Sequence, residues 1–201
     1  MPWSSYALDT FMAPKLSQLS SCGAPELATS NTQIAPFLLN SILGVKLPEP
    51  FHRLAFNFIR RVDQASHEYA QGRDYLLKYL QTQEPLPISL YFQALTHFEQ
   101  TLAMLYQAAM FCKELTGTRP YEQGDHSFFD RINGLYNASR HMHGRIAGPH
   151  FPADATVAVW ITNDGLECHD EAVTFHELHD ALKEYAERAR YVAYSTTDAE
   201  G

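Results

Sequence analysis

Residues 88–112 read ISLYFQALTHFEQTLAMLYQAAMFC and carry the clearest structural pattern of the chain. Apolar side chains recur here at steps of three and four residues, which gathers them on one face of an α-helix. This face consists of Ile88, Phe92, Leu95, Phe98, Leu102, Leu105, Ala109 and Cys112. Glu99 lies beside it, either as a half-buried partner for a histidine or arginine or simply at the edge of the core. Gly117 and Pro120 end the predicted helix.

A second long amphipathic helix is predicted immediately before this one. Its apolar positions follow the same steps, with one interruption at Gly72, and comprise Phe51, Leu54, Phe58, Val62, Ala65, Tyr69, Leu76 and Tyr79 or Leu80. Pro85 and Pro87 separate the two helices and leave room for only a short turn. Two long helices joined in this way are expected to pack as an antiparallel pair.

A third helix is predicted to begin after Asp125 or Ser127, either of which is a suitable N-cap residue. Gly148 and Pro149 mark its expected end. Its core face should consist of Phe128, Ile132, Leu135, Ser139, Met142 and Ile146.

Residues 150–173 interrupt the helical pattern. Residues 156–162, TVAVWIT, are rich in β-prone side chains, and Asn163-Asp164-Gly165 favours a turn. A small hairpin or an extended loop is therefore expected here. The last helix opens with Thr174-Phe175-His176-Glu177, which has the sequence of a capping box, and runs to about Tyr194.

These elements predict an all-α fold: an up-down bundle of about four main helices, with a short β-like hairpin or loop before the last helix. We expect the bundle to occupy residues 49–195. Residues 1–48 should form an irregular N-terminal arm with a short helix in residues 31–44, and residues 196–201 a polar tail. The side chains expected to anchor the arm are Trp3, Tyr6 and Phe11.

The composition is that of a globular protein and limits the classes of partner. Of the 201 residues, 45% are apolar and 19% are charged, which excludes global disorder. The net charge is −8 and is unevenly spread: residues 164–201 hold 3 basic and 10 acidic side chains, whereas residues 1–163 hold 12 and 13. Because a general polyanion binder carries a broad basic surface, any contact with nucleic acid must be local.

The 3 cysteines, Cys22, Cys112 and Cys168, lie far apart and lack CxxC spacing. This pattern argues against a disulfide framework and against a cysteine zinc site. A reducing, cytoplasmic location is the simplest interpretation. No apolar run approaches the roughly 20 residues that a membrane span needs, so we expect no membrane partner.

A histidine-rich acidic cluster opens the last helix. His176 and His179 are three residues apart, and residues 168–171 read Cys-His-Asp-Glu. Zinc-binding helices more often place two histidines four residues apart with a third ligand from elsewhere. We therefore expect a solvent-exposed helix start without a metal or cofactor, and weak binding of a divalent ion is the alternative.

The most informative stretch for function is residues 131–145, RINGLYNASRHMHGR. The face opposite the apolar stripe consists of Asn133, Asn137, Arg140, His141 and Gly144. Asn137 and His141 are four residues apart, so their side chains can touch. Asparagine and glycine weaken a helix interior, and a face that tolerates them is often a contact or active face. The alternative interpretation is an ordinary solvent-exposed helix face.

Two long antiparallel helices followed by a helix that carries Asn137-x-x-x-His141 resemble the HEPN superfamily. Members are small all-α domains, many of them ribonucleases. Their motif is an arginine, then a polar residue such as asparagine, then three to five residues and a histidine, and dimerisation brings two motifs together. In this chain Asn137 and His141 match, and Tyr136 stands at the arginine position. The resemblance covers roughly residues 50–195.

The resemblance implies metal-independent chemistry on RNA. Asn137 and His141 would be the catalytic residues, with His141 as general base or acid and Asn137 orienting it or the phosphate. The residues expected to bind RNA are Arg131, Tyr136, Arg140 and Arg145. The family also implies a homodimer through the third helix. Because Tyr136 replaces the arginine, we favour a degenerate member that binds RNA without cutting it. The alternative is a non-enzymatic helical module that dimerises or binds a protein partner.

Overall fold

The computed structural model describes residues 4–28, 33–43, 47–82, 87–148, 151 and 155–194. This part of the protein is mostly helical, with one small antiparallel sheet of three strands. In chain order the elements are α1 (Ser5–Phe11), the 3-10 helix η1 (Leu16–Gln18), α2 (Ile34–Leu43), α3 (Phe51–Gln81), α4 (Ile88–Thr116), α5 (Phe128–Arg140), α6 (Met142–Ile146), β1 (Trp160–Ile161), β2 (Gly165–Glu167), β3 (Ala172–Thr174) and α7 (Phe175–Tyr194). None of the described helices combines the length and the apolar character that a bilayer crossing requires.

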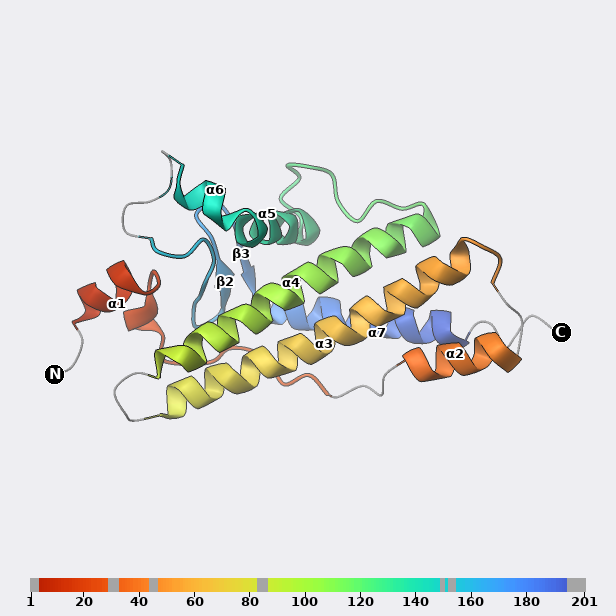
Figure 1. Ribbon diagram of the computed structural model, residues 1–201, viewed down its shortest axis with the longest axis horizontal. Coiled ribbons are helices and arrows are strands. Elements are labelled where there is room, and N and C mark those ends of the chain that lie inside the picture. Colours follow the sequence, from red (N-terminus) through yellow and green to blue (C-terminus); the bar gives the residue numbers. More distant parts are fainter. Residues whose placement is uncertain are drawn as a thin grey trace.

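The predicted pair of long helices is confirmed as α3 and α4, which lie antiparallel along the length of the molecule (Figure 1). Their apolar faces meet in the core, where the rings of Tyr69 and Phe98 form an edge-to-face contact with centroids 6.0 Å apart. The interruption at Gly72 has a packing reason. A Cβ atom there would lie 3.0 Å from the Phe98 ring, so the missing side chain lets the two helices approach closely.

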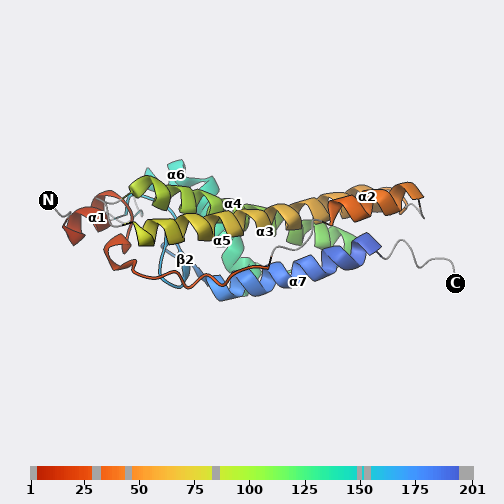
Figure 2. The same ribbon diagram turned by 90° about the horizontal axis from the view of Figure 1, so that it is seen from below.

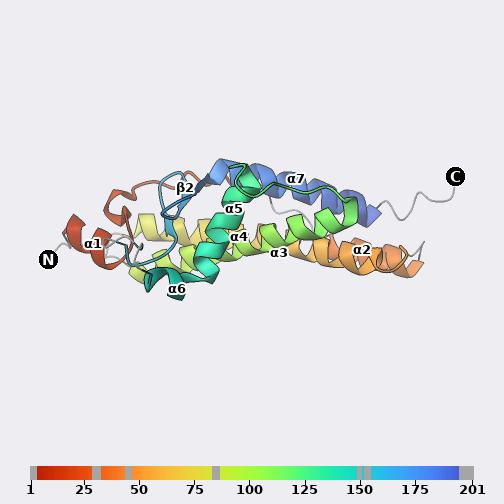
Figure 3. The same cartoon turned by 90° about the horizontal axis from the view of Figure 1, so that it is seen from above.

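The other helices do not confirm the expected up-down bundle of four. α7 packs on α3 and forms a second layer beneath the α3–α4 helix pair (Figure 2). It runs in the same direction as α4. α5 crosses α4 obliquely instead of running along it (Figure 3). The fold is therefore mostly helical as predicted, but the third predicted helix crosses the long helix pair instead of running alongside it.

The third predicted helix is also shorter than expected, because the helix breaks at His141. The backbone there has φ −106° and ψ 25°, and α6 follows as a separate helix of five residues. Ile132 and Leu135 are buried as predicted. Met142 and Ile146 were expected in the core, but each is 41% exposed, because the break turns α6 away from the α5 stripe.

The expected hairpin before the last helix is a three-stranded meander, β1-β2-β3. The Asn163-Asp164-Gly165 turn joins β1 to β2 as its sequence predicts. Gly165 is required, because a Cβ atom there would lie 2.0 Å from the carbonyl oxygen of Val173 on the paired strand. The Ile161 N–H donates to the buried Tyr91 hydroxyl at 3.1 Å, which fixes the sheet to α4.

The capping box at the start of α7 is confirmed. The Thr174 N–H donates to Glu177 Oε2 at 2.9 Å, and the Glu177 N–H donates to Thr174 Oγ1 at 3.1 Å. Two backbone donors at the helix start are thereby satisfied.

The N-terminal arm is more ordered than predicted and is held by other side chains. Tyr6 and Phe11 were expected to anchor it, but they are 70% and 69% exposed, whereas Leu8 and Leu16 enter the core. The α1 helix has only seven residues, so it buries one narrow face, and Leu8 lies on that face. Trp3 and residues 196–201 lie outside the described residues, and α2 falls within the predicted residues 31–44.

Candidate functional site

Four basic side chains gather where α5 ends and α6 begins. Arg140, His141 and His143 are exposed, and Arg145 is half-buried. We call these four residues the α5–α6 basic surface. Arg140 lies in the last turn of α5, and His143 and Arg145 lie in the last turn of the short α6. Basic groups are favourable at these positions because the helix dipole is negative at its C-terminus. Within the described part of the chain, Arg145 is the one member with an acidic partner, Asp170.

Tyr136 holds Arg140 at this surface. Its ring stacks on Tyr106 of α4, with centroids 5.1 Å apart and planes 24° apart. The Arg140 guanidinium carbon lies 6.0 Å from the centre of the Tyr136 ring, and Nη1 lies 3.5 Å from the Tyr136 hydroxyl. Tyr136 therefore occupies the motif's arginine position as a packed aromatic residue that supports an arginine four residues later.

Asn137 and His141 share a backbone hydrogen bond, and no hydrogen bond joins their two side chains. The His141 N–H donates to the Asn137 carbonyl at 3.0 Å. The Asn137 amide instead donates to Asn133 Oδ1 at 3.0 Å. The His141 imidazole is exposed and has no partner among the described residues. Within one chain, the predicted catalytic pair is therefore not assembled.

Arg131 lies away from the α5–α6 basic surface and connects α5 to the start of α7. Its Nη2 lies 2.5 Å from Glu177 Oε1, and its Nη1 donates to the Ala172 carbonyl at 2.7 Å. The hydrogen bond from Arg131 lowers the pKa of Glu177 to about 2, against the opposing effect of burial. Arg131 is thus committed to contacts within the chain.

Gly134 and Gly144, the two glycines of residues 131–145, have different surroundings. A Cβ atom on Gly134 would lie 2.8 Å from Glu171 Cγ, so the Glu171 side chain of the same chain already occupies the space beside this glycine. Apart from its chain neighbours and the nearby backbone of its own helix, Gly144 has no described atom within 4 Å of the place where its Cβ would stand. Of the two, only Gly144 leaves open space for a partner.

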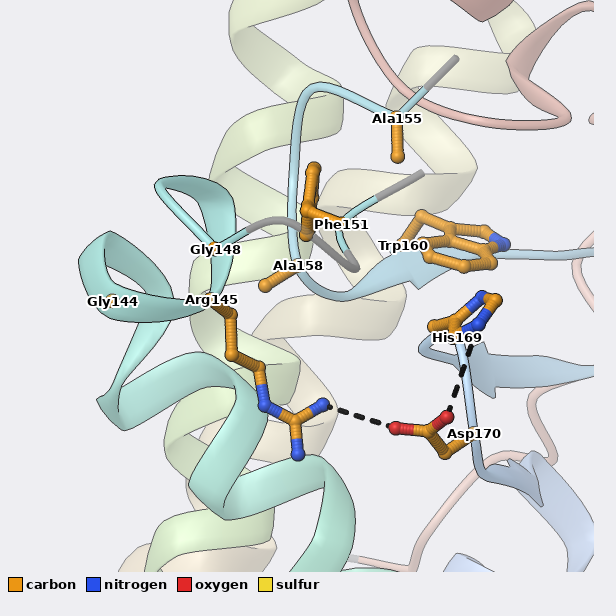
Figure 4. A pocket seen from close by; sticks show the side chains of 9 residues that line it. All are labelled: Gly144, Arg145, Gly148, Phe151, Ala155, Ala158, Trp160, His169 and Asp170. Atoms are coloured by element: carbon orange, nitrogen blue, oxygen red, sulfur yellow. Dashed lines mark ion pairs between the residues drawn. The ribbon is translucent and has the colours of Figure 1, made fainter. Parts of the chain in front are cut away.

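A pocket of about 380 Å³ lies between α6 and the sheet (Figure 4). Arg145 reaches across it, and its Nη1 lies 3.5 Å from Asp170 Oδ2. His169 stands between Asp170 and Trp160, with Nε2 4.0 Å from Asp170 Oδ1. We call this cavity the Arg145–Asp170 pocket. The sequence pattern does not indicate this pocket, although His169 and Asp170 belong to residues 168–171, for which weak binding of a divalent ion is the alternative interpretation.

Trp160 forms the aromatic wall of this pocket. The residue is 8% exposed, and its buried indole N–H has no hydrogen-bond partner among the described residues. A buried donor without a partner costs stability, and such groups are uncommon in folded proteins. Phe151, Ala155 and Ala158 add further apolar lining on the same side (Figure 4).

Glu99 is half-buried on α4 beneath the end of α5. Burial raises the pKa of its carboxyl group, and a hydrogen bond with the Ser139 side chain opposes that rise. Its partner is therefore a hydroxyl group, and not the histidine or arginine that one interpretation of the sequence offered. The contact helps to seat α5 on α4.

The histidines of the last helix stand apart from these groups. His179 Nδ1 lies 3.2 Å from Asp180 Oδ1 on the α7 surface. Within the described ranges, no group of three His, Cys, Asp or Glu side chains is arranged to hold a metal ion.

Comparison with known proteins adds no relative to this picture. The chain matches no protein-family model, no curated protein and no solved structure.

Proposed function

We propose that this protein binds single-stranded RNA through the α5–α6 basic surface, as a HEPN-like domain that binds without cutting. One observation carries the proposal. In a chain with a net charge of −8, Arg140, His141, His143 and Arg145 gather at one place, where Asp170 is the one acidic partner among the described residues. Arginine side chains clustered on one face are the electrostatic footprint of a nucleic-acid contact, and Arg140 and Arg145 supply the two permanent positive charges here.

Binding is favoured over cleavage because of how the motif residues are used. The Asn137 amide is engaged by Asn133, and the Tyr136 ring is packed against Tyr106. Neither side chain is directed at His141, so one chain offers a lone exposed imidazole. General acid–base catalysis needs further groups to orient the proton-transfer residue and to stabilise the phosphate.

A symmetric dimer through α5 and α6 belongs to the same proposal. Met142 and Ile146 place exposed apolar surface on α6, and Gly144 between them has open surroundings. Isologous pairing would cover both patches and bring two basic surfaces side by side. The same observation supports the second candidate function, a non-enzymatic module whose role is the dimer itself.

The test is fluorescence anisotropy with a labelled single-stranded RNA of about ten nucleotides, titrated between about 50 and 200 mM salt. Arg140→Ala and Arg145→Ala should each weaken binding and reduce the slope of log affinity against log salt by about 0.7. Arg53→Ala is the matched control, because Arg53 is exposed at the start of α3 and pairs with Glu49. Wild-type protein that fails to bind, or binds equally well after both substitutions, would overturn the proposal.

Incubation with RNA in EDTA separates binding from cleavage. We expect intact RNA with the wild type. Cleavage that is lost in His141→Ala would instead identify an enzyme, because removal of a proton-transfer group typically costs about 10²–10⁴-fold in rate.

A further inference from the structure

The Arg145–Asp170 pocket has the size and walls of a site for a planar heterocycle. Its volume of about 380 Å³ falls within the range of small-ligand sites. One side is apolar and includes Trp160, Phe151 and Ala158, whereas Arg145 and Asp170 lie on the other (Figure 4). Unstacked nucleobases bind in such pockets, with their faces against aromatic or apolar side chains and their edges against polar groups.

The polar side of the pocket presents a donor next to an acceptor. Arg145 Nη1 and Asp170 Oδ2 are 3.5 Å apart, longer than the distance of a charge-assisted hydrogen bond. The two side chains are 37% and 61% exposed, so both retain capacity to bond a ligand. An arginine fork and a carboxylate side by side form a row of donors followed by acceptors.

Guanine carries the complementary row along its edge. Its N7 and O6 atoms accept hydrogen bonds, and the adjacent N1–H and N2 amino groups donate them. Arginine bonded to O6 and N7 is the commonest specific contact to this base. Adenine presents an amino donor where guanine has O6 and an acceptor where guanine has N1–H, so it would face both protein groups with the wrong polarity. Pyrimidines offer less area to the apolar wall.

We propose that the Arg145–Asp170 pocket binds a guanine base, with Arg145 donating to O6 and N7 and Asp170 accepting from N1–H and the N2 amino group. The inference rests on the proposed RNA binding, which it deepens by naming the preferred base. Arg145 belongs both to the pocket and to the α5–α6 basic surface, so a strand bound on α6 reaches the pocket without a change of fold. His169, between Asp170 and Trp160, is placed to donate to the ribose or phosphate of the same nucleotide.

The first experiment uses free nucleotides and calorimetry. Guanosine monophosphate should bind the full-length protein, inosine monophosphate should bind more weakly because it lacks the N2 amino group, and adenosine and uridine monophosphates should not saturate. Asp170→Asn should reduce guanosine monophosphate affinity by about tenfold or more. Asp180→Asn is the matched control, an exposed acid on α7 beside His179. Thermal melts of both variants check that the fold is retained.

The second experiment compares two labelled RNAs of equal length, an oligouridine and the same strand with one central guanosine. Wild type should prefer the guanosine strand, and Asp170→Asn should bind both strands equally. Equal binding of both strands by wild type, with no binding of guanosine monophosphate, overturns the guanine site and leaves the proposed function standing. Binding of guanosine monophosphate without binding of either RNA supports the pocket and overturns the proposed function. Absence of all binding overturns both.

Discussion

Replacement of Glu177 by glutamine isolates the ion pair that connects α5 to α7. Glutamine at this position still serves a capping box, so the bonds with Thr174 can persist. What is lost is the charge that faces Arg131, whose Nη2 lies 2.5 Å from Glu177 Oε1. The substitution therefore tests the charge contribution apart from the helix cap.

The pKa of Glu177 sets the magnitude. Arg131, together with the two hydrogen bonds from Thr174, lowers it from the ordinary 4.5 to about 2, which would correspond to about 3 kcal/mol for all these contacts if it were converted in full. The Glu177 side chain is 37% exposed, so solvent screens the pair, and we expect a loss of about 1–2 kcal/mol in the free energy of unfolding.

The pH dependence provides a second, independent measurement. Because the folded-state pKa is lowered, the stabilisation is fully present above the ordinary value of 4.5 and is lost as the pH falls toward 2. Wild type and Glu177→Gln should therefore differ by about 1–2 kcal/mol at neutral pH and converge at the acidic end, where the wild-type carboxyl group becomes protonated.

Urea unfolding followed by far-ultraviolet circular dichroism measures both quantities. Glu184→Gln is the control, because Glu184 also pairs with an arginine, Arg188, but on the exposed surface of α7, where such pairs contribute little. Equal stability of Glu177→Gln and Glu184→Gln at neutral pH would refute the assignment of Arg131 as a structural connector. A difference from wild type that stays constant down to acidic pH would show that charge is not its cause.

Three further outcomes are expected. In a protein that carries Glu171→Ala, Gly134→Ala should raise the free energy of unfolding by about 1 kcal/mol, because alanine is the better helix former. With Glu171 present this gain should be absent, because the new Cβ meets Glu171 Cγ. Urea unfolding of the double-mutant cycle measures the difference. His141→Ala should leave the melting temperature unchanged, since the imidazole is exposed and has no partner among the described residues, and should reduce RNA affinity in the anisotropy assay. The double substitution Met142→Glu with Ile146→Glu should shift a dimer to a monomer in sedimentation velocity. An unchanged sedimentation coefficient would contradict a dimer interface on α6.

The parts of the fold that the sequence predicted are those with a long or strictly local signal. The α3 and α4 stripes repeat over many turns, so tertiary contacts have little room to override them. The Thr174 to Glu177 capping box and the Asn163 turn depend on neighbouring residues alone. The prediction of where the third helix ends was wrong. The apolar residues beyond His141 keep helical spacing, and nothing in that spacing indicates a break in the backbone.

The candidate site was predicted in part for the same reason. Helical spacing placed Arg140 and His141 at one surface, but it could not tell that Asn133 would bond Asn137 first or that Glu177 would engage Arg131. On a helix, the residues four positions before and four positions after Asn137 are equally close to it. A hydrogen-bond partner from another helix cannot be recognised from the neighbouring sequence. The contact of Arg145 with Asp170 joins α6 to the turn between two strands, which only the tertiary fold brings together.

The geometry of the pocket depends on how α5 is joined to β3. Asp170 lies in the turn before β3, closed by a hydrogen bond from the Cys168 N–H to the Glu171 carbonyl at 2.8 Å. The next residue, Glu171, passes over Gly134 of α5, and Ala172 accepts from Arg131. These contacts hold the turn against α5, and α6 follows directly from the end of α5 with Arg145 on it. Substitutions that loosen this junction should therefore weaken guanine selectivity before they weaken RNA binding, because selectivity needs Arg145 and Asp170 in register, whereas attraction to the phosphate backbone needs only the charge.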